Sequence, residues 1–250
     1  MFIDNKKAII IGASSGLGKE LVFLLSEKKI DLVISSRNTE DLEVIAKHNR
    51  IVNHNSIEVI KLDLESLNHD EILSYVNTCY KINAYYDYIF ITSGIIDEND
   101  NGIYSANVVD KIMYINSLNI YKIVNEIAIK QKDKYSNITV ISSIAAIRAR
   151  SNNMVYSSSK ISLEFLISGL RHYYHKDQII FQIYRAGYLN TVMTRGKKLL
   201  FPVADPRKFA VKIYNNRKKD FGIRYYPFFW NFIAIIIQLT PWFLYKKLKF

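Results

Sequence analysis

The sequence predicts an α/β fold in which helices cover both faces of a parallel sheet. Short apolar runs of strand length alternate with stretches whose apolar residues recur at helical spacing, as in repeated βαβ units. The first apolar run ends directly in a glycine-rich turn that opens a helix. The chain has 250 residues, 49% of them hydrophobic, which is enough to bury one full core and near the upper limit for a single one.

We expect about seven strands with helices between them, and no repeat or Pro/Gly-rich linker marks a second domain. Residues 1–226 are therefore expected to form one domain, followed by an apolar and basic helical tail at 227–250. The expected strands are Lys7–Ile11, Leu32–Ser35, Ile57–Leu62, Tyr88–Thr92, Ile138–Ser142, Ile179–Tyr184 and Phe221–Tyr226. The expected helices are Leu17–Ser26, Thr39–His48, Ser66–Cys79, Val108–Lys130, Tyr156–Tyr174 and Pro206–Asn215.

Cysteine usage and the N-terminal pattern indicate a cytoplasmic protein. Cys79 is the only cysteine, so the chain cannot form an internal disulfide, which fits a reducing compartment. The first apolar run, Lys7–Ile11, has only the length of a strand and is not typical of a secretory signal. Cys79 lies in no recognisable metal or redox motif, and no metal site is expected.

The positive charge is confined to one end of the chain. The formal net charge is +11; residues 195–250 contain 13 Lys/Arg against two acidic residues, and 13 − 2 = 11 accounts for the whole excess. This distribution indicates an anionic surface or a phosphate-bearing substrate near the C-terminus, the alternative being a solvated charged tail. The basic segment is interleaved with aliphatic residues, so a nucleic-acid partner is not expected.

The glycine-rich turn predicts a dinucleotide-binding loop. It reads Gly12-Ala13-Ser14-Ser15-Gly16-Leu17-Gly18 and stands between the first strand and the first helix. Glycines at these places permit a tight turn and a close approach of the backbone to a pyrophosphate, whose charge the N–H groups and dipole of the helix start stabilise. With the alternating strands and helices, this loop is typical of a Rossmann-type doubly wound fold.

The end of the second strand favours NADP(H) over NAD(H). An NAD-preferring site usually has an acidic side chain there to bind the ribose hydroxyls, but this chain has Ser35-Ser36-Arg37-Asn38. Arg37, with Ser14 or Ser36, could hold a 2′-phosphate; alternatively Arg37 is an exposed residue at a helix entry. Asp63, after the third strand, is placed either to accept from the adenine amino group or to cap a helix.

Four residues form a candidate catalytic group: Asn116, Ser143, Tyr156 and Lys160. Tyr156 and Lys160 are four apart and therefore share one face of a helix, where the ammonium would lower the tyrosine pKa from its usual value near 10. Ser143 follows a strand and could hydrogen-bond a reacting carbonyl or alcohol oxygen. Asn116, within the long helix, could hold a water that links Lys160 to solvent.

Together these motifs resemble the short-chain dehydrogenase/reductase family over residues 6–226. The resemblance implies that Gly12, Gly16 and Gly18 form the dinucleotide loop, that Asp63 touches adenine and that Lys160 also binds the nicotinamide ribose. The four residues above would then be the catalytic tetrad. The implied cofactor-binding set is Gly12, Ser14, Ser15, Gly16, Leu17, Gly18, Arg37, Asp63, Leu64, Ser93, Gly94, Tyr156, Lys160, Gly187, Leu189 and Thr191.

Three motifs depart from the family pattern. Ile11 replaces the usual Thr before the first glycine, Ile91-Thr92-Ser93-Gly94 replaces Asn-Asn-Ala-Gly, and Ala186-Gly187 replaces Pro-Gly. None of these changes removes a catalytic group. Thr191 matches the family threonine that meets the nicotinamide carboxamide.

The C-terminal run from Tyr225 to Tyr245 carries no charge and has basic clusters at both ends, the second being Lys246, Lys247 and Lys249. Pro227 and Pro241 divide it into a helix of about thirteen residues and a short second one, so we expect it to lie on a membrane surface rather than to span the bilayer. The alternative is that the tail completes the core or a subunit contact.

The ending resembles the tails of reductases acting on polyprenyl-phosphate-linked keto-sugars, such as the decaprenylphosphoryl-2-keto-ribose reductases. This resemblance implies a peripheral membrane ketoreductase whose substrate is a lipid-linked keto-sugar or another lipid ketone. The loop after the sixth strand repeats the pairing of cations and apolar groups, with Arg195, Lys197 and Lys198 before Leu199-Leu200-Phe201. Two alternatives remain open: a soluble reductase of a small keto or hydroxy compound whose tail serves a homo-oligomer, and a non-catalytic nucleotide-binding scaffold.

Overall fold

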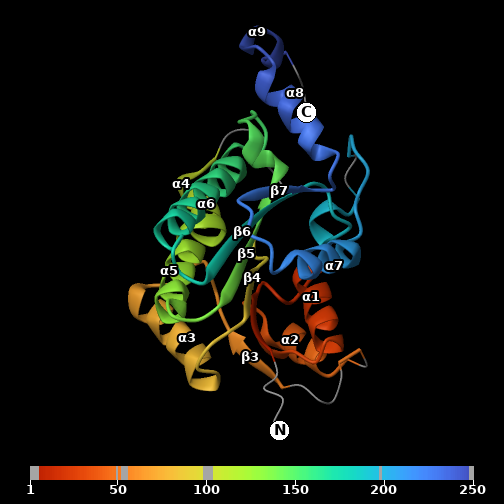
Figure 1. The fold of residues 1–250 in the computed structure, drawn as a ribbon. Helices are drawn as coiled ribbons and strands as arrows, with labels where there is room; N and C mark the ends of the chain where they lie inside the picture. The colour runs from red at the N-terminus through yellow and green to blue at the C-terminus, as the bar shows by residue number, and fades with distance from the viewer. Residues whose placement is uncertain (1–5, 49, 52–55, 98–103, 197–198, 248–250) are drawn as a thin grey trace.

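The computed structural model describes residues 6–48, 50–51, 56–97, 104–196 and 199–247, and Lys197, Lys198 and Lys249 lie outside them. In this part of the chain a single parallel sheet of seven strands has the order β3-β2-β1-β4-β5-β6-β7 (Figure 1), which confirms the expected architecture. The strands are β1 Lys7–Ile11, β2 Asp31–Ser36, β3 Ile57–Lys61, β4 Tyr88–Ile91, β5 Ser136–Ser143, β6 Ile179–Ala186 and β7 Ile223–Tyr226.

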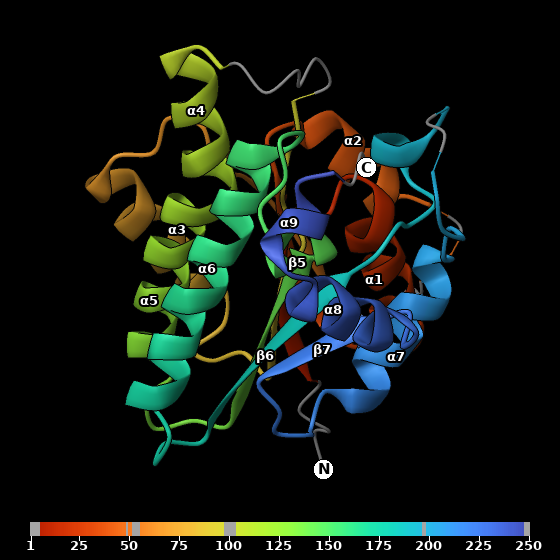
Figure 2. The same cartoon turned by 90° about the horizontal axis from the view of Figure 1, so that it is seen from above.

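Helices cover both faces of the sheet. Figure 2 shows α1, α2 and α7 on one side and α3, α4, α5 and α6 on the other. Each face has its own apolar core, one containing Leu21, Leu42 and Phe209, the other Val76, Ile123 and Leu163. The helices are α1 Gly16–Glu27, α2 Thr39–Ala46, α3 His69–Ile82, α4 Ala106–Met113, α5 Asn119–Gln131, α6 Met154–Tyr173 and α7 Pro206–Asn216.

The central strands are continuous apolar runs because both of their faces are buried. Ile9 and Ile10, neighbours on β1, are completely buried in opposite cores. The strand order reverses between β1 and β4, which pair directly, with Ile9 opposite Ile89. In such sheets the loops diverge at this point and leave a crevice beyond the carboxyl ends of the strands, so the fold itself places the site there.

The expected helices all differ from the observed ones by one to three residues at one or both ends, and two of the differences have a clear physical cause. The helix expected at Ser66–Cys79 is α3, His69–Ile82. It begins later because Asn68 forms a capping box with Glu71: the Glu71 N–H donates to Asn68 Oδ1 at 2.9 Å, and the Asn68 N–H donates to Glu71 Oε2 at 2.8 Å.

The helix expected at Val108–Lys130 is interrupted at its centre. It consists of α4, one turn of π-helix (η1, Tyr114–Leu118) and α5. Such a turn contains one residue more than an α-helical turn and is frequent at functional sites. Here it carries Asn116, whose side chain is completely buried.

The tail forms two helices, α8 Trp230–Leu239 and α9 Trp242–Tyr245, called here the C-terminal helix pair. It stands beyond the carboxyl end of the sheet (Figures 1 and 2), and α8 is shorter than the expected thirteen residues. Of its residues Trp230, Ala234 and Tyr245 are buried, whereas most of its other apolar side chains are exposed. In the described parts of the chain, no helix has both the length and the apolar character to cross a membrane.

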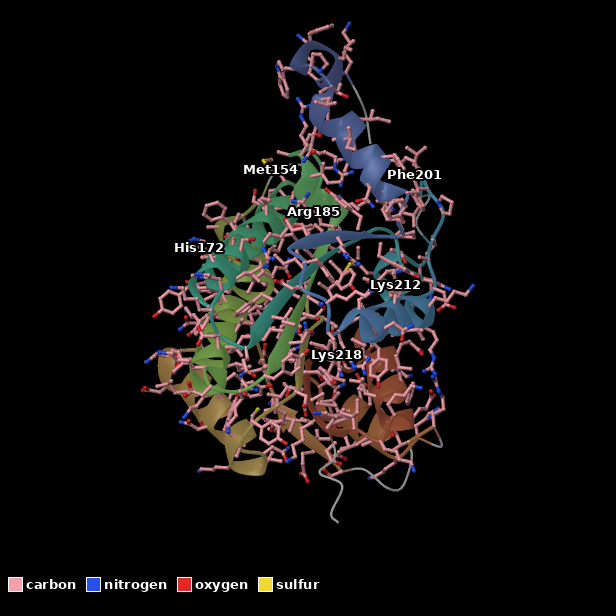
Figure 3. All side chains as sticks on the ribbon, viewed as in Figure 1. Met154, His172, Arg185, Phe201, Lys212 and Lys218 are labelled. Atoms are coloured by element: carbon pink, nitrogen blue, oxygen red, sulfur yellow. The ribbon has the colours of Figure 1, made fainter. Side chains whose placement is uncertain are left out.

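Trp230 attaches this helix pair to the domain. Its ring packs edge-on against Tyr188 and lies 4.7 Å from Phe201, measured between ring centroids; Figure 3 labels Phe201 beside the base of α8. The indole also occupies the space beside Gly187, where an added Cβ would stand 2.0 Å from its Nε1. Gly187 therefore lacks a side chain because Trp230 fills its place, and the tail is partly core.

We expect Trp230→Ala to lower the free energy of unfolding by about 3–5 kcal/mol, because it leaves a cavity beside Gly187. Trp242→Ala is the matched control: Trp230 is 3% exposed and Trp242 67%, so the control should change stability by less than about 0.5 kcal/mol. Denaturant unfolding followed by circular dichroism measures both. Equal effects of the two substitutions would show that Trp230 does not anchor the helix pair.

Candidate active site

A cleft of about 920 Å³ opens at the carboxyl ends of β1, β2, β4, β5 and β6, where the strand order reverses. This volume is in the range of small-molecule and cofactor sites. Every residue of the predicted cofactor-binding set lines the cleft except Gly18, and so do Ser143, Tyr156 and Lys160. The structure thus brings together residues from more than half the length of the chain.

The loop between β1 and α1 makes a cradle that side chains would block. Gly12 has φ +90°, and a Cβ on it would stand 2.6 Å from the Ser93 nitrogen. Gly18 does not face the cleft; its Cβ would collide with the Gly12 carbonyl oxygen at 2.1 Å, so its role is to let α1 pack against the loop. Ser15, the N-cap of α1, makes no side-chain hydrogen bond to the helix, which leaves the first N–H groups available for an anion. This cradle fits the pyrophosphate of a dinucleotide.

Arg37 and Asp63 lie at the adenosine end of the cleft. Arg37 is exposed, and its only ion pair among the described residues is a long one to Glu65 at 3.9 Å, which holds it weakly. Asp63 Oδ1 accepts from the Glu65 N–H at 3.1 Å. Asp63 therefore caps a turn while lining the cleft, so both roles expected from the sequence are compatible with its position.

Tyr156 and Lys160 lie on one face of α6, as their spacing predicts, with Nζ of Lys160 5.9 Å from the centre of the Tyr156 ring. The ammonium donates to the carbonyl oxygens of Ser93 and Ile141, each at 3.4 Å. Ser143, at the end of β5, hydrogen-bonds Tyr156, and its Oγ accepts from the Ala145 N–H at 3.1 Å. The loop after β4, strand β5 and helix α6 thus hold the side chains of Ser143, Tyr156 and Lys160 in place.

Burial works against the charged forms of both Tyr156 and Lys160. Burial raises the pKa of Tyr156 above its usual value, although the hydrogen bond from Ser143 and the charge of Arg150 lower it. The lowered pKa that the sequence predicted from Lys160 is therefore wrong for the protein without bound cofactor, because burial outweighs the charges. Burial also lowers the pKa of Lys160 from 10.5 to about 8, and the nearby Glu164 carboxylate opposes this change. A lysine pKa near 8 still leaves the ammonium protonated at neutral pH.

Glu164 belongs to a buried network that the sequence analysis did not identify. Arg185 on β6 donates Nε to Glu164 Oε1 at 2.9 Å and Nη2 to Oε2 at 2.6 Å. Ser142 donates to the same carboxylate, and Arg185 Nη1 donates to the Tyr225 hydroxyl at 2.6 Å. The sequence did contain a signal for this network: Arg185 stands near the end of a largely apolar strand, and a charge in such a place is buried only when an opposite charge pairs with it.

Asn116 lies behind the cleft rather than in its wall. Its Oδ1 accepts from the Ile95 N–H, and its Nδ2 donates to the Ile95 carbonyl, both at 2.8 Å, and to Ser159 Oγ at 3.1 Å. A Cβ on Gly94 would stand 2.9 Å from Lys160 Nζ and 3.5 Å from Asn116 Oδ1, so the two side chains meet around this glycine. The expected water between Asn116 and Lys160 stays a prediction.

Several residues of the cleft wall were missed. Arg148 and Arg150 are the only charged residues between Ser143 and Tyr156, which marked that stretch as part of a site. Arg150 lines the cleft and Arg148 does not. The lining residues absent from the predicted set include Ile95, Asp97, Arg150, Asn152, Asn153, Tyr188, Val192, Met193, Thr194 and Leu199.

Comparison with known proteins identifies this class of site. The family model described as short chain dehydrogenase matches residues 6–199. An uncharacterized oxidoreductase of Listeria monocytogenes, Lmo0432, is 32% identical over 177 residues, which cover 68% of each chain. The 3-oxoacyl-[acyl-carrier-protein] reductase FabG of Buchnera aphidicola is 25% identical over 197 residues, 78% of each chain. The chain therefore belongs to the short-chain dehydrogenase/reductase family and is an NAD(P)-dependent oxidoreductase.

Solved structures share the fold. A short-chain dehydrogenase from Burkholderia cenocepacia in complex with NADP has a TM-score of 0.79 at 17% identity, covering 96% of this chain and 100% of its own. An alcohol dehydrogenase from Thermococcus sibiricus, complexed with 5-hydroxy-NADP, has a TM-score of 0.76 at 17% identity, covering 89% and 96%. At these identities the likeness is one of fold.

We expect Tyr156→Phe to cut turnover at least about a hundredfold with a ketone that the wild type reduces, because it deletes the proton donor alone. NADPH binding, followed by fluorescence titration, should stay within about twofold, since the ring remains. Lys160→Met should lower turnover and also weaken NADPH binding, because Lys160 is predicted to bind the nicotinamide ribose as well as to act on Tyr156. Tyr173→Phe, at the far exposed end of α6, is the control. Near-normal turnover of Tyr156→Phe would remove Tyr156 from this role.

Proposed function

We propose that this chain is an NADP(H)-dependent ketoreductase that acts at a membrane surface on a lipid ketone such as a lipid-linked keto-sugar. The observation that carries the proposal is the convergence of Ser143, Tyr156 and Lys160 beside the dinucleotide cradle, in a cleft next to an exposed apolar helix pair. The bound nicotinamide would supply or accept the hydride. The resemblance of the tail to decaprenylphosphoryl-2-keto-ribose reductases belongs to this proposal.

The chain's own groups handle the proton. Ser143 would hold the substrate oxygen, and the Tyr156 hydroxyl would exchange a proton with it. The Lys160 ammonium would stabilise the phenolate and bind the ribose hydroxyls, which would add to the two long hydrogen bonds that this buried cation makes to the carbonyls of Ser93 and Ile141. Asn116 would keep the backbone of Ile95 in place through its two 2.8 Å hydrogen bonds.

The preference for NADP(H) depends on Arg37. Its exposed guanidinium lines the cleft at the end of β2, where a 2′-phosphate would lie, and Ser14 and Ser36 line the same region. An arginine can hold a phosphate through two parallel hydrogen bonds. The two solved relatives named above carry NADP or a derivative of it, which is compatible with this choice.

We expect Arg37→Asp to weaken NADPH binding at least about tenfold and to shift preference toward NADH, through loss of a cation and gain of a ribose acceptor. Lys111→Gln is the control, because Lys111 bonds Glu65 at 2.9 Å but does not line the cleft. Titration of both cofactors against both variants decides the matter. An unchanged ratio of affinities for Arg37→Asp would show that Arg37 only faces solvent.

The outer face of the C-terminal helix pair suits a lipid surface. Lys246 and Lys247 follow it directly and are exposed, and exposed Leu200 with Arg195 from the loop after β6 adds the same combination of apolar and basic groups. Rings and aliphatic chains at headgroup level with lysines on anionic lipid are the pattern of an interfacial helix. The exposed apolar residues are Phe228, Phe232, Ile235, Ile236, Leu239, Trp242, Phe243 and Leu244.

The inner side of the same helix pair is next to the cleft. Trp230 packs on Gly187 and Tyr188, both of which line it, and Arg150 adds a cation to the cleft wall. An anionic lipid could therefore keep its chain on the apolar face while its headgroup enters beside Arg150. We place the protein in the cytoplasm, at the inner face of the cytoplasmic membrane.

A second copy of the chain could cover the same apolar face, since homo-oligomers are common and an exposed patch of this kind marks an interaction site. Truncation after Pro227 does not separate the two occupants, because it also removes the buried Trp230, Ala234 and Tyr245. Substitutions on the exposed face avoid this problem.

We expect the wild type to sediment with vesicles of phosphatidylcholine and phosphatidylglycerol, more weakly as salt rises. Ile236→Ser with Leu239→Ser, at positions 67% and 76% exposed, should lower the partition coefficient at least about tenfold through lost apolar contact. Val44→Ser with Phe165→Ser, at 69% and 82%, is the matched control on other helices.

Wild type that stays in the supernatant at low salt would contradict membrane attachment. If it also elutes as a dimer that the Ile236→Ser/Leu239→Ser variant makes monomeric, the helix pair is a subunit contact and the substrate is a soluble ketone.

A further inference from the structure

The segment from Ile144 to Asn153 lies between two catalytic residues and is bound to the C-terminal helix pair. Its first turn, η2 (Ile144–Ile147), is followed by Arg148, whose Nη1 donates to the Ile237 carbonyl at 2.8 Å and to that of Thr240. Carbonyls at the end of a helix have no partner within the helix and carry the negative end of its dipole. One arginine from the catalytic side thus caps α8.

A second contact is made by the helix pair to the segment, through Tyr245. The Tyr245 ring of α9 lies against the Arg148 guanidinium, 3.9 Å from its Cζ to the ring centroid. The Tyr245 hydroxyl donates to the Ala149 carbonyl at 2.8 Å, and Tyr245 is buried. Each partner therefore fixes the other: Arg148 caps the helix pair, and Tyr245 holds the backbone next to Arg148.

The segment is continuous with the catalytic groups at both ends. At its start, Ser143 Oγ accepts from the Ala145 N–H inside η2, so a shift of η2 moves the bond that orients the Ser143 hydroxyl. Toward its end, Arg150 and Asn153 line the cleft, and Arg150 lowers the pKa of Tyr156. Asn153 has φ +60°, a sparsely populated conformation that its surroundings must maintain.

We propose that the C-terminal helix pair positions residues 144–153, that Arg148 is the positioning residue, and that a membrane docked on the outer face steadies this catalytic segment. The membrane part rests on the proposed function. A surface that binds only the packed arrangement of α8 and α9 stabilises that arrangement, and with it everything that the arrangement holds in place. Membrane attachment and catalysis are then coupled through the guanidinium of Arg148.

Hydrogen exchange measured by mass spectrometry tests this on the full chain, with and without phosphatidylcholine/phosphatidylglycerol vesicles. In Arg148→Gln, exchange in residues 144–153 should rise at least about tenfold. Vesicles should slow exchange in both 144–153 and 230–245 of the wild type, but only in 230–245 of the variant. Arg171→Gln, which breaks an exposed pair with Asp220, is the control and should behave as wild type.

Two more variants separate positioning from general destabilisation. Tyr245→Phe removes the hydroxyl that donates to Ala149 but keeps the ring beside Arg148, and it should raise exchange in 144–153 by about threefold. Arg148→Lys should restore part of the protection that is lost in Arg148→Gln. For a ketone that the wild type reduces, Arg148→Gln should lower kcat with NADPH affinity unchanged, because Arg148 does not line the cleft.

Wild-type exchange in residues 144–153 of Arg148→Gln and Tyr245→Phe would overturn the positioning role. Vesicles that slow exchange in 230–245 of the wild type but not in 144–153 would overturn the coupling. Vesicles without effect on either segment would instead overturn membrane attachment, while the exchange rates of the variants in buffer still decide whether Arg148 positions the segment.

Discussion

The site depends on keeping one ammonium group, that of Lys160, both buried and charged. Burial lowers its pKa to about 8, and Glu164, one turn further along α6, is the charge that opposes this change. A second buried charge would itself be costly, and Arg185 neutralises it through a two-pronged pair that Ser142 and Tyr225 complete. These contacts connect α6 with β5, β6 and β7, so the network that maintains the lysine's charge also fixes the helix carrying Tyr156 against the strands that end at the cleft.

The sheet supplies the remaining constraint. Because the strand order reverses between β1 and β4, the loops after these strands separate and leave the crevice in which the glycine-rich loop meets Ser143, Tyr156 and Lys160. Close packing there tolerates no extra atoms: a Cβ on Gly12 would collide with Ser93, and one on Gly94 with the Lys160 ammonium. The two glycines thus serve different needs: Gly12 lets the first loop pack closely against Ser93, and Gly94 leaves room for the buried charged side chain of Lys160.

Short-range patterns predicted most of this arrangement. The seven strands, the glycine loop and the Tyr156–Lys160 face of α6 follow from spacing alone, since periodicity and turn chemistry are local. Strand and helix limits moved by a few residues where a cap decided them, as at Asn68. The π-helical turn at Asn116, the Glu164–Arg185 pair and the entry of Arg150 into the cleft were not predicted, because each depends on a partner far away in the chain. Substrate and membrane contact stay proposals, because the sequence pattern for them is compositional.

The C-terminal helix pair combines two features that the sequence analysis treated as alternatives, because its inner side packs on the domain while its outer side is exposed. Trp230 replaces the missing side chain of Gly187, and Arg148 and Tyr245 contact each other at the other end, so the inner side is packed against the domain at both ends. The outer side keeps a row of apolar residues exposed, which evolution rarely leaves without a partner. A helix pair attached only by a flexible linker could not affect the conformation of the active site. The helix pair shares its last helical carbonyls with Arg148, five residues after Ser143, so a partner that covers the outer face would also act on the segment that joins Ser143 to Tyr156.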